Sequence, residues 1–339
     1  MCFGGAGMMP HKPVYEFHSV FAPSIREYLA IKEALGEKIT LPGNTLRQFD
    51  RYCSSIGLED ATLTAELAEN WLLTKAGEKP ETRASRISVL WCFARHFSAN
   101  GGKATWRPTP GYAGRKKRYI PYIYTKEEVK NIFSAADSMP ESYGKSRFNV
   151  VFPAVIRTLY GCGLRIAEAL ALRVKDVDLE NGFIFVHAGK FGKDRKIPIS
   201  DSLLQYLKGY YKDNAGFIGV AADGWFFPNA KGECYSQRTV YDKFRQILWI
   251  AGISHQGKGK GPRVHDLRHT FAVHALQQNV EQGKDIYTSL TGLMTYLGHG
   301  KITSTEYYLR LTAEVFPDFL ERADKVCARA IPEVVCYEE

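Results

Sequence analysis

Apolar residues recur at helical spacing through the first hundred positions of the chain. Phe21, Ile25 and Leu29 fall on one face of a helix in this region. The same spacing predicts three further helices, over 44–56, over 64–75 and from Pro80 onward. Because the intervening loops are short, residues 18–105 are predicted to form a small helical bundle that follows an N-terminal tail, 1–17.

Residues 106–121 carry glycines and prolines but no apolar periodicity, which predicts a linker between two domains. The linker contains an unbroken basic run, Arg115, Lys116, Lys117 and Arg118. This run has two readings: an ordinary solvated linker, or a strap that contacts phosphates.

The next part of the chain, 122–312, mixes helical and strand patterns. Thr125 and Glu128 have the spacing of a capping box, and an apolar helical face follows them. Two strands, 183–187 and 195–199, are joined by a glycine-rich basic hairpin. Helices are predicted over 148–160, 165–172, 201–212, 236–251, 265–278, 285–296, 302–312 and 313–330. The fold class predicted is mainly α with a small β-sheet: an N-terminal helical bundle and a mixed α/β domain.

Composition narrows the class of protein. The 339 residues are 45% hydrophobic and 24% charged, an ordinary globular balance. No apolar run reaches the roughly 18 residues that cross a bilayer, and no secretory signal is evident. The seven cysteines are scattered without a CxxC pair, which favours a reducing compartment over a disulfide framework or a thiolate zinc site. We therefore expect a cytoplasmic protein that does not enter membranes.

The formal net charge is +9, and the basic excess extends over both predicted domains. A basic surface attracts polyanions, with nucleic acid the leading candidate. A solvated surface with a modest lysine excess would give the same figure.

Three clusters could carry chemistry. His265, Arg268 and His269 share one face of a predicted helix. A guanidinium forks onto phosphate oxygens, and an imidazole exchanges protons near neutral pH. Arg165 follows two glycines, with Glu168 three residues later, and His299 precedes a helix that contains adjacent tyrosines, Tyr307 and Tyr308. Each cluster alone is also compatible with a structural role.

Taken in order, these clusters resemble the catalytic signature of the tyrosine recombinase (phage integrase) family. The matching segments are GCGLRIAEALAL, GKFGKDRKIPI, HDLRHTFA and LGHGKITSTEYYLR, with Tyr308 nine positions after His299. The catalytic set that the resemblance implies is Arg165, Lys190, His265, Arg268, His299 and Tyr308. It also implies a core-binding domain over 18–105, a catalytic domain over 122–312, and an exchange helix and tail over 313–339.

In this family a tyrosine attacks a DNA phosphate and forms a 3′-phosphotyrosine bond, and a 5′ hydroxyl leaves. The resemblance makes Tyr308 the nucleophile, and helical geometry points Tyr307 about 100° away. Arg165 and Arg268 would hold the non-bridging oxygens and offset the charge of the transition state. The ester conserves bond energy, so neither a metal nor a cofactor is expected.

The remaining roles concern protons. His265 would assist the Tyr308 proton, His299 would donate to the phosphate, and Lys190 would protonate the leaving oxygen. Glu168 resembles a supporting carboxylate beside Arg165, although a surface ion pair is an equal reading. The pair Ser304-Thr305 stands where the family usually has two threonines.

The expected partner is double-stranded DNA, gripped by a two-lobed clamp, in a homo-tetramer at the nucleoid. The 313–330 helix would dock its Phe316, Phe319 and Leu320 face into a neighbouring protomer. Further DNA contacts are expected from Lys193, Lys258, Lys260 and Arg263. The process would be integration, excision or transposition of a mobile element.

Rival readings make distinct predictions. His265 and His269 have the spacing of a zinc pair, but the intervening arginine would repel a cation. The spacing of a phosphate-binding NTPase loop is absent. A DNA-binding protein without catalysis would show the same basic surface but would not need the whole set. A type IB topoisomerase-like enzyme would share the chemistry and relax supercoils without two specific sites.

Overall fold

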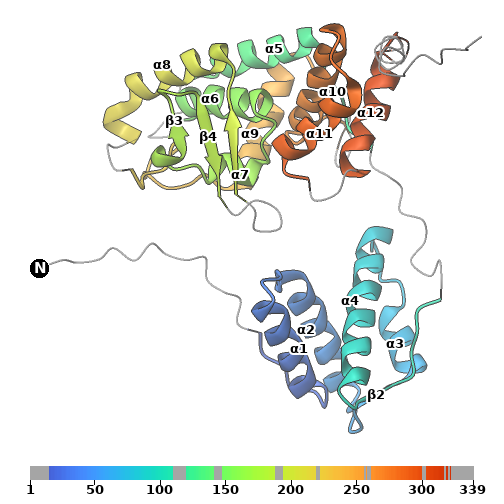
Figure 1. Ribbon diagram of the computed structural model, residues 1–339. Helices are drawn as coiled ribbons and strands as arrows, with labels where there is room; N and C mark the ends of the chain where they lie inside the picture. Colours follow the sequence, from blue (N-terminus) through green and yellow to red (C-terminus); the bar gives the residue numbers. More distant parts are fainter. Residues whose placement is uncertain are drawn as a thin grey trace, which may run out of the picture. The chain divides into compact units, whose positions relative to one another are not determined.

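The computed structural model describes residues 15–109, 120–140, 147–187, 194–218, 222–255, 257, 261–299, 303–316, 318–319 and 321. The fold is mainly helical with small sheets, as predicted (Figure 1). The chain divides into two compact units, Met1–Tyr119 and Ile120–Glu339. Within the described ranges, every helix is too short or too polar to cross a bilayer.

The first unit is a bundle of α1 (Ala22–Ala34), α2 (Thr40–Ser55), α3 (Ala65–Leu72) and α4 (Pro80–Ala99). A short parallel pair, β1 (Thr62–Leu63) and β2 (Lys103–Ala104), closes it. Its core is aromatic: the rings of Phe21 and Phe49 lie 5.5 Å apart, and both side chains are fully buried. Helix α2 begins at Thr40, four residues before the predicted start. Pro42 is tolerated there because the first helical N–H groups have no acceptor within the helix.

The second unit contains α5 (Lys126–Asp137), α6 (Phe148–Gly161), α7 (Ile166–Leu170), α8 (Asp201–Ile218), α9 (Gln237–Ile250), α10 (Asp266–Glu281), α11 (Ile286–Leu297) and α12 (Thr303–Val315). The predicted capping box is present at α5. The Thr125 hydroxyl accepts from the Glu128 N–H, and the Glu128 carboxylate accepts from the Thr125 N–H. A short 3₁₀ turn, η1 (Val174–Asp176), leads into the sheet.

The sheet is antiparallel, in the order β3 (Val177–Asp178), β4 (Phe183–Val186) and β5 (Arg195–Pro198). Ile184 pairs with Ile197, and both are fully buried. Strand β3 was not predicted, because two residues are too few to show alternation. Figure 1 shows the sheet towards one end of this unit and α10, α11 and α12 towards the other.

Helix α10 belongs to both hydrophobic cores of the second unit. Leu267, in its first turn, packs in the core built around α6 and the sheet. Val273 and Leu276 pack in the core shared with α11 and α12. Since α10 is packed against α6, α11 and α12, its first turn is held rigidly between two cores.

The C-terminal part departs from the prediction. Helix α12 continues to Val315, past the expected helix boundary at 313. Phe319 is 3% exposed in the α10–α12 core, and Phe316 packs against the same cluster. The prediction that these two rings dock into a neighbouring protomer is therefore wrong for the chain as described. The physical reason is that the α10–α12 core of the same chain covers Phe319. Leu320 lies outside the described residues.

Candidate active site

The first turn of α10 presents three candidate side chains. His265 occupies the N-cap position, and Arg268 and His269 follow within one turn. The turn is fixed by Asp266, whose fully buried carboxylate accepts from the backbone N–H of Arg263 at 2.9 Å. The sequence therefore places the guanidinium and both imidazoles on a support that cannot easily shift.

Arg268 connects three segments of the site. Its side chain is 2% exposed. One terminal nitrogen donates to the backbone oxygen of Gly163 and the other to that of Leu297, each at 2.7 Å. The second nitrogen also lies 3.1 Å from His299 Nε2. Burial lowers the pKa of Arg268 to about 10, which leaves the group charged at neutral pH.

Arg165 lies at the start of α7, just after a sharp turn. Gly163 makes this turn with φ +56°, in the left-handed region that suits glycine. The Arg165 backbone N–H donates to Glu168 Oε2 at 2.9 Å, and its guanidinium donates to Oε1 at 2.7 Å. The Arg165 side chain is 23% exposed. The rest of its guanidinium has no acceptor within the described ranges, so it is available to a phosphate.

His299 and Tyr308 stack against each other. Their ring centroids are 5.9 Å apart and the planes differ by 10°. His299 Nδ1 lies 2.9 Å from the hydroxyl of the fully buried Thr305, which fixes the imidazole. Tyr308 is 3% exposed. Tyr307 is half-buried against the same core, in keeping with the packing role expected of it.

Burial and nearby positive charge act in opposite directions on the pKa of the Tyr308 phenol. Burial raises the pKa of Tyr308, and the positive charges of Arg268 and Arg165 oppose that rise. Burial and the charge of Arg268 lower the pKa of His265 to about 4. The imidazole is therefore neutral at pH 7, the form in which one ring nitrogen carries no proton.

The structure thus brings together Arg165, Glu168, His265, Arg268, His299 and Tyr308. Glu168 is not a surface ion pair, because its side chain is only 9% exposed. Arg263 is 45% exposed, with its guanidinium 3.7 Å from Asp266. The other predicted residues lie outside the described residues: Arg115, Lys116, Lys117, Arg118, Lys190, Lys193, Lys258 and Lys260.

Sequence reasoning named one residue of the site without giving it a role, and it missed another. The ring of His269 lies 5.0 Å from that of His265 and 5.6 Å from that of Tyr308, and its Nδ1 is buried without a hydrogen-bond partner among the described residues. The sequence placed His269 on the same helix face as His265 and Arg268 and weighed a zinc pair as a rival reading, yet the described part of the chain contains no cluster of three metal-ligating side chains. The missed residue, Arg195, contacts Glu168, and only the fold reveals this pairing.

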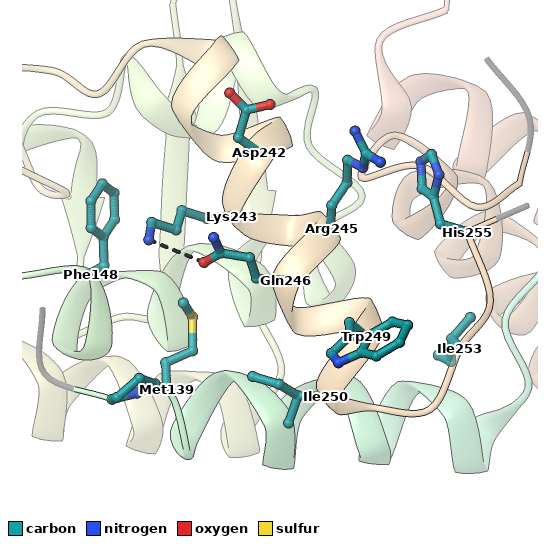
Figure 2. Close-up of a pocket in the computed structure, with 11 residues that line it drawn as sticks. Met139, Phe148, Asp242, Lys243, Arg245, Gln246, Trp249, Ile250, Ile253 and His255 are labelled. Carbon is teal, nitrogen blue, oxygen red and sulfur yellow. Dashed lines mark hydrogen bonds between the residues drawn. The ribbon is translucent and has the colours of Figure 1, made fainter. Parts of the chain in front are cut away.

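A separate hollow of about 580 Å³ lies between α9 and the end of α5 (Figure 2). Trp249 and Ile250 on its rim are 85% and 48% exposed. None of the catalytic candidates lines it. The candidate active site is instead a set of packed side chains at the start of α10.

Comparison with known proteins identifies the family of this chain. Residues 123–314 match the model of the phage integrase family. Tyrosine recombinase XerA of Pyrococcus horikoshii is 30% identical over 288 residues, covering 83% of this chain and 87% of the relative. A Sinorhizobium fredii protein named as an integrase/recombinase, y4rB, is 29% identical over 91% of this chain and 98% of its own length.

A solved structure shares the fold. The XerH site-specific recombinase bound to a palindromic difH substrate superposes with a TM-score of 0.61 at 21% identity, over 90% of this chain and 84% of that one. The chain belongs to the phage integrase family, and it is a tyrosine-type site-specific recombinase.

Proposed function

We propose that this recombinase cleaves and rejoins DNA through a 3′-phosphotyrosine bond to Tyr308. The observation that carries the proposal is the convergence of that phenol with two guanidinium groups. The charges of Arg268 and Arg165 both act on the Tyr308 hydroxyl, and His299 stacks on its ring. A phosphate placed beside these groups would meet a nucleophile and positive charge together.

The reaction balances within the protein and DNA. The Tyr308 oxygen attacks phosphorus and loses its proton to a neutral base, for which His265 is the candidate. Arg165 and Arg268 hold the non-bridging oxygens as charge gathers there. The bond to the 5′ oxygen breaks and that oxygen takes up a proton, which we assign to Lys190. Attack by another 5′ hydroxyl reverses these steps and restores the phenol.

The approach of DNA must change the site. Tyr308 is 3% exposed and Arg268 is 2% exposed, so a phosphate cannot reach both in the chain as it stands. The His299–Tyr308 stack is the contact whose opening would admit the phosphate. Arg165, with its open guanidinium, would make the first contact.

We further propose that the two units grip one duplex as a clamp. Basic residues outside the described ranges would supply phosphate contacts: Arg115, Lys116, Lys117, Arg118, Lys193, Lys258 and Lys260. The exposed Arg263 would add another. We propose that the biological role is integration, excision or transposition of a mobile element. The DNA would be at the nucleoid, in the cytoplasm.

Assembly of four protomers on two duplexes is the quaternary state that this reaction calls for, since two sites must exchange strands. Phe319 is buried against its own chain, and Phe316 is partly buried against the same cluster. We therefore place the contacts between protomers elsewhere than on this pair of rings.

The decisive experiment uses a DNA duplex nicked near the crossover, so that the cleaved 5′ fragment diffuses away. The wild-type protein should become covalently attached to DNA, and Tyr308→Phe should not. Tyr307→Phe is the matched control and should attach as the wild type does. Attachment that survives in Tyr308→Phe but is lost in Tyr307→Phe would overturn the assignment of the nucleophile.

A further inference from the structure

Arg195 is held in the site by every nitrogen of its guanidinium. It is the first residue of β5, and its side chain is 10% exposed. Nη1 donates to Glu168 Oε1 at 3.2 Å and Nη2 donates to Glu168 Oε2 at 2.7 Å. Nε donates to the backbone oxygen of Tyr296 at 3.1 Å. Three of its five N–H groups are thus engaged within the protein and the side chain is nearly buried, so Arg195 contributes mainly to the structure of the site.

The carboxylate of Glu168 lies at the centre of three positive charges. Besides the Arg195 fork, it accepts from the backbone and the side chain of Arg165. Arg268 Nη1 lies 4.0 Å from Oε2. Burial alone would raise the pKa of Glu168, but the hydrogen bonds from Arg195 and Arg165 lower it to about 2. Glu168 is therefore ionised at neutral pH.

An ionised Glu168 beside Arg165 and Arg268 has two opposing effects. It orients the Arg165 guanidinium, and it also cancels positive charge that a phosphate would otherwise meet. The third arginine, Arg195, reduces this cancellation. Its bidentate contact offsets the charge of the Glu168 carboxylate and fixes both carboxylate oxygens. With Arg195 in place, the local group of four side chains carries a net charge of +2 on its formal charges.

The same side chain supports the turn that carries His299. Gly298 ends α11 in the left-handed conformation, with φ +67°. A Cβ at this position would lie 3.2 Å from Arg195 Nη1 and 3.3 Å from its Cδ, so Arg195 packs directly over the turn. Arg195 therefore connects the start of α7 with the end of α11, the two segments to which Arg268 is also bonded.

We infer that Arg195 is a positioning residue for strand cleavage: it holds Glu168 so that Arg165 and Arg268 present their positive charge to the scissile phosphate. The inference rests on the proposed function, since it concerns the same phosphate. It adds a third arginine, one that acts through a carboxylate and not on DNA.

The test measures single-turnover cleavage of the nicked duplex at saturating protein, together with the affinity for an uncleavable duplex. Arg195→Ala should lower the cleavage rate constant by roughly tenfold to a hundredfold, because a buried carboxylate loses two bonds. DNA affinity should change by less than about threefold, since Arg195 does not touch the phosphate. Arg195→Lys keeps the charge without the fork, and it should recover part of the rate.

Two features separate positioning from a folding defect. A misfolded fraction lowers the amplitude of cleavage, whereas loss of positioning lowers the rate constant of the molecules that react. Arg157→Ala is the matched control: Arg157 pairs with Asp137 at 2.6 Å, its side chain is 16% exposed, and it lies in α6 outside the candidate set. Its rate constant should equal that of the wild type.

A double-mutant cycle with Glu168→Gln tests the route of action. If Arg195 acts through the carboxylate, Arg195→Ala should have much less effect in the Glu168→Gln background. Additive effects, or a wild-type rate constant in Arg195→Ala, would overturn the inference. So would a large loss of DNA affinity with an unchanged rate at saturation. Failure of the proposed function looks different, because the wild-type protein itself would then form no covalent bond to DNA.

Discussion

Arg268 donates a 2.7 Å hydrogen bond to the backbone oxygen of Gly163, the residue at which the chain turns towards Arg165. Its other terminal nitrogen bonds the last residue of α11, Leu297. The buried Arg268 thus connects two segments that are far apart in the sequence by hydrogen bonds, and it is also a candidate phosphate ligand. Arg165 has no such structural duty, since its guanidinium bonds only Glu168 within the described part of the chain.

The first prediction separates these two arginines. Arg165→Ala and Arg268→Ala should each slow cleavage of the nicked duplex by about 10²- to 10³-fold, as loss of a preorganised charge does. Arg268→Ala should also lower the free energy of unfolding by about 2 to 4 kcal/mol, because two buried carbonyl groups lose their donor. Urea denaturation of both variants measures this difference. Equal midpoints for Arg268→Ala and the wild type would contradict the structural role.

The second prediction concerns the turn before Arg165. Gly163→Ala should destabilise the protein, because a left-handed residue with a Cβ costs about 1 to 2 kcal/mol and the added methyl would overlap Phe271. Gly209→Ala is the matched control: Gly209 lies within α8 with open space around its Cα, so alanine should stabilise by about 0.5 to 1 kcal/mol. Thermal unfolding of the two variants should therefore shift in opposite directions.

The third prediction is a loss of stability in mild acid. The pKa of His265 is lowered to about 4 and that of His269 to about 3, both by burial and neighbouring positive charge. Unfolded histidines titrate near pH 6.5, so the unfolded chain takes up protons first. The free energy of unfolding should therefore fall as the pH drops from about 6.5 towards 4.

His269→Gln tests the histidine contribution, since glutamine does not titrate. Urea denaturation at pH 7, 6 and 5 should show a shallower decline for this variant than for the wild type. Parallel declines would mean that His269 titrates normally in the folded chain. The Glu168 carboxylate follows a separate window: its pKa is lowered from 4.5 to about 2, so its contribution is lost only as the pH falls below about 4.5.

The fourth prediction concerns the basic linker. If Lys116 and Lys117 contact phosphates, replacing both with alanine should reduce the salt dependence of duplex binding by a slope of about 2. Fluorescence anisotropy over a salt series measures the slope. Lys130→Ala is the control: Lys130 in α5 is 74% exposed and lies 3.9 Å from Glu127. An unchanged slope in the linker variant would mean that the basic run is an ordinary solvated linker and does not contact phosphates.

Local patterns predicted much of the fold. The capping box at Thr125 gave a helix start, because it acts over a few residues. Helix α2 was predicted to begin too late because Pro42 reads as a breaker in isolation, although it is harmless in a first helical turn. Strand β3 could not be found because its two residues gain their conformation from pairing with β4.

The candidate site also contains residues that the sequence predicted and residues that only the fold reveals. Arg165, Arg268 and Tyr308 were predicted from the resemblance of ordered motifs to the tyrosine recombinase family, and their roles remain predictions. Arg195 was not, because its partner Glu168 lies 27 residues earlier and only the fold brings them together. The outcome for Phe319 was missed for a related reason: an apolar helix face predicts burial but does not say whether the covering surface belongs to the same chain.

The hydrogen bonds of Arg268 to two distant carbonyl groups have a consequence for engineering. If Arg268 also binds the phosphate as we propose, a substitution at this position would change the stability of the fold and the rate of cleavage together. A directed-evolution campaign seeking new target sites would do better to vary other residues and leave this one untouched.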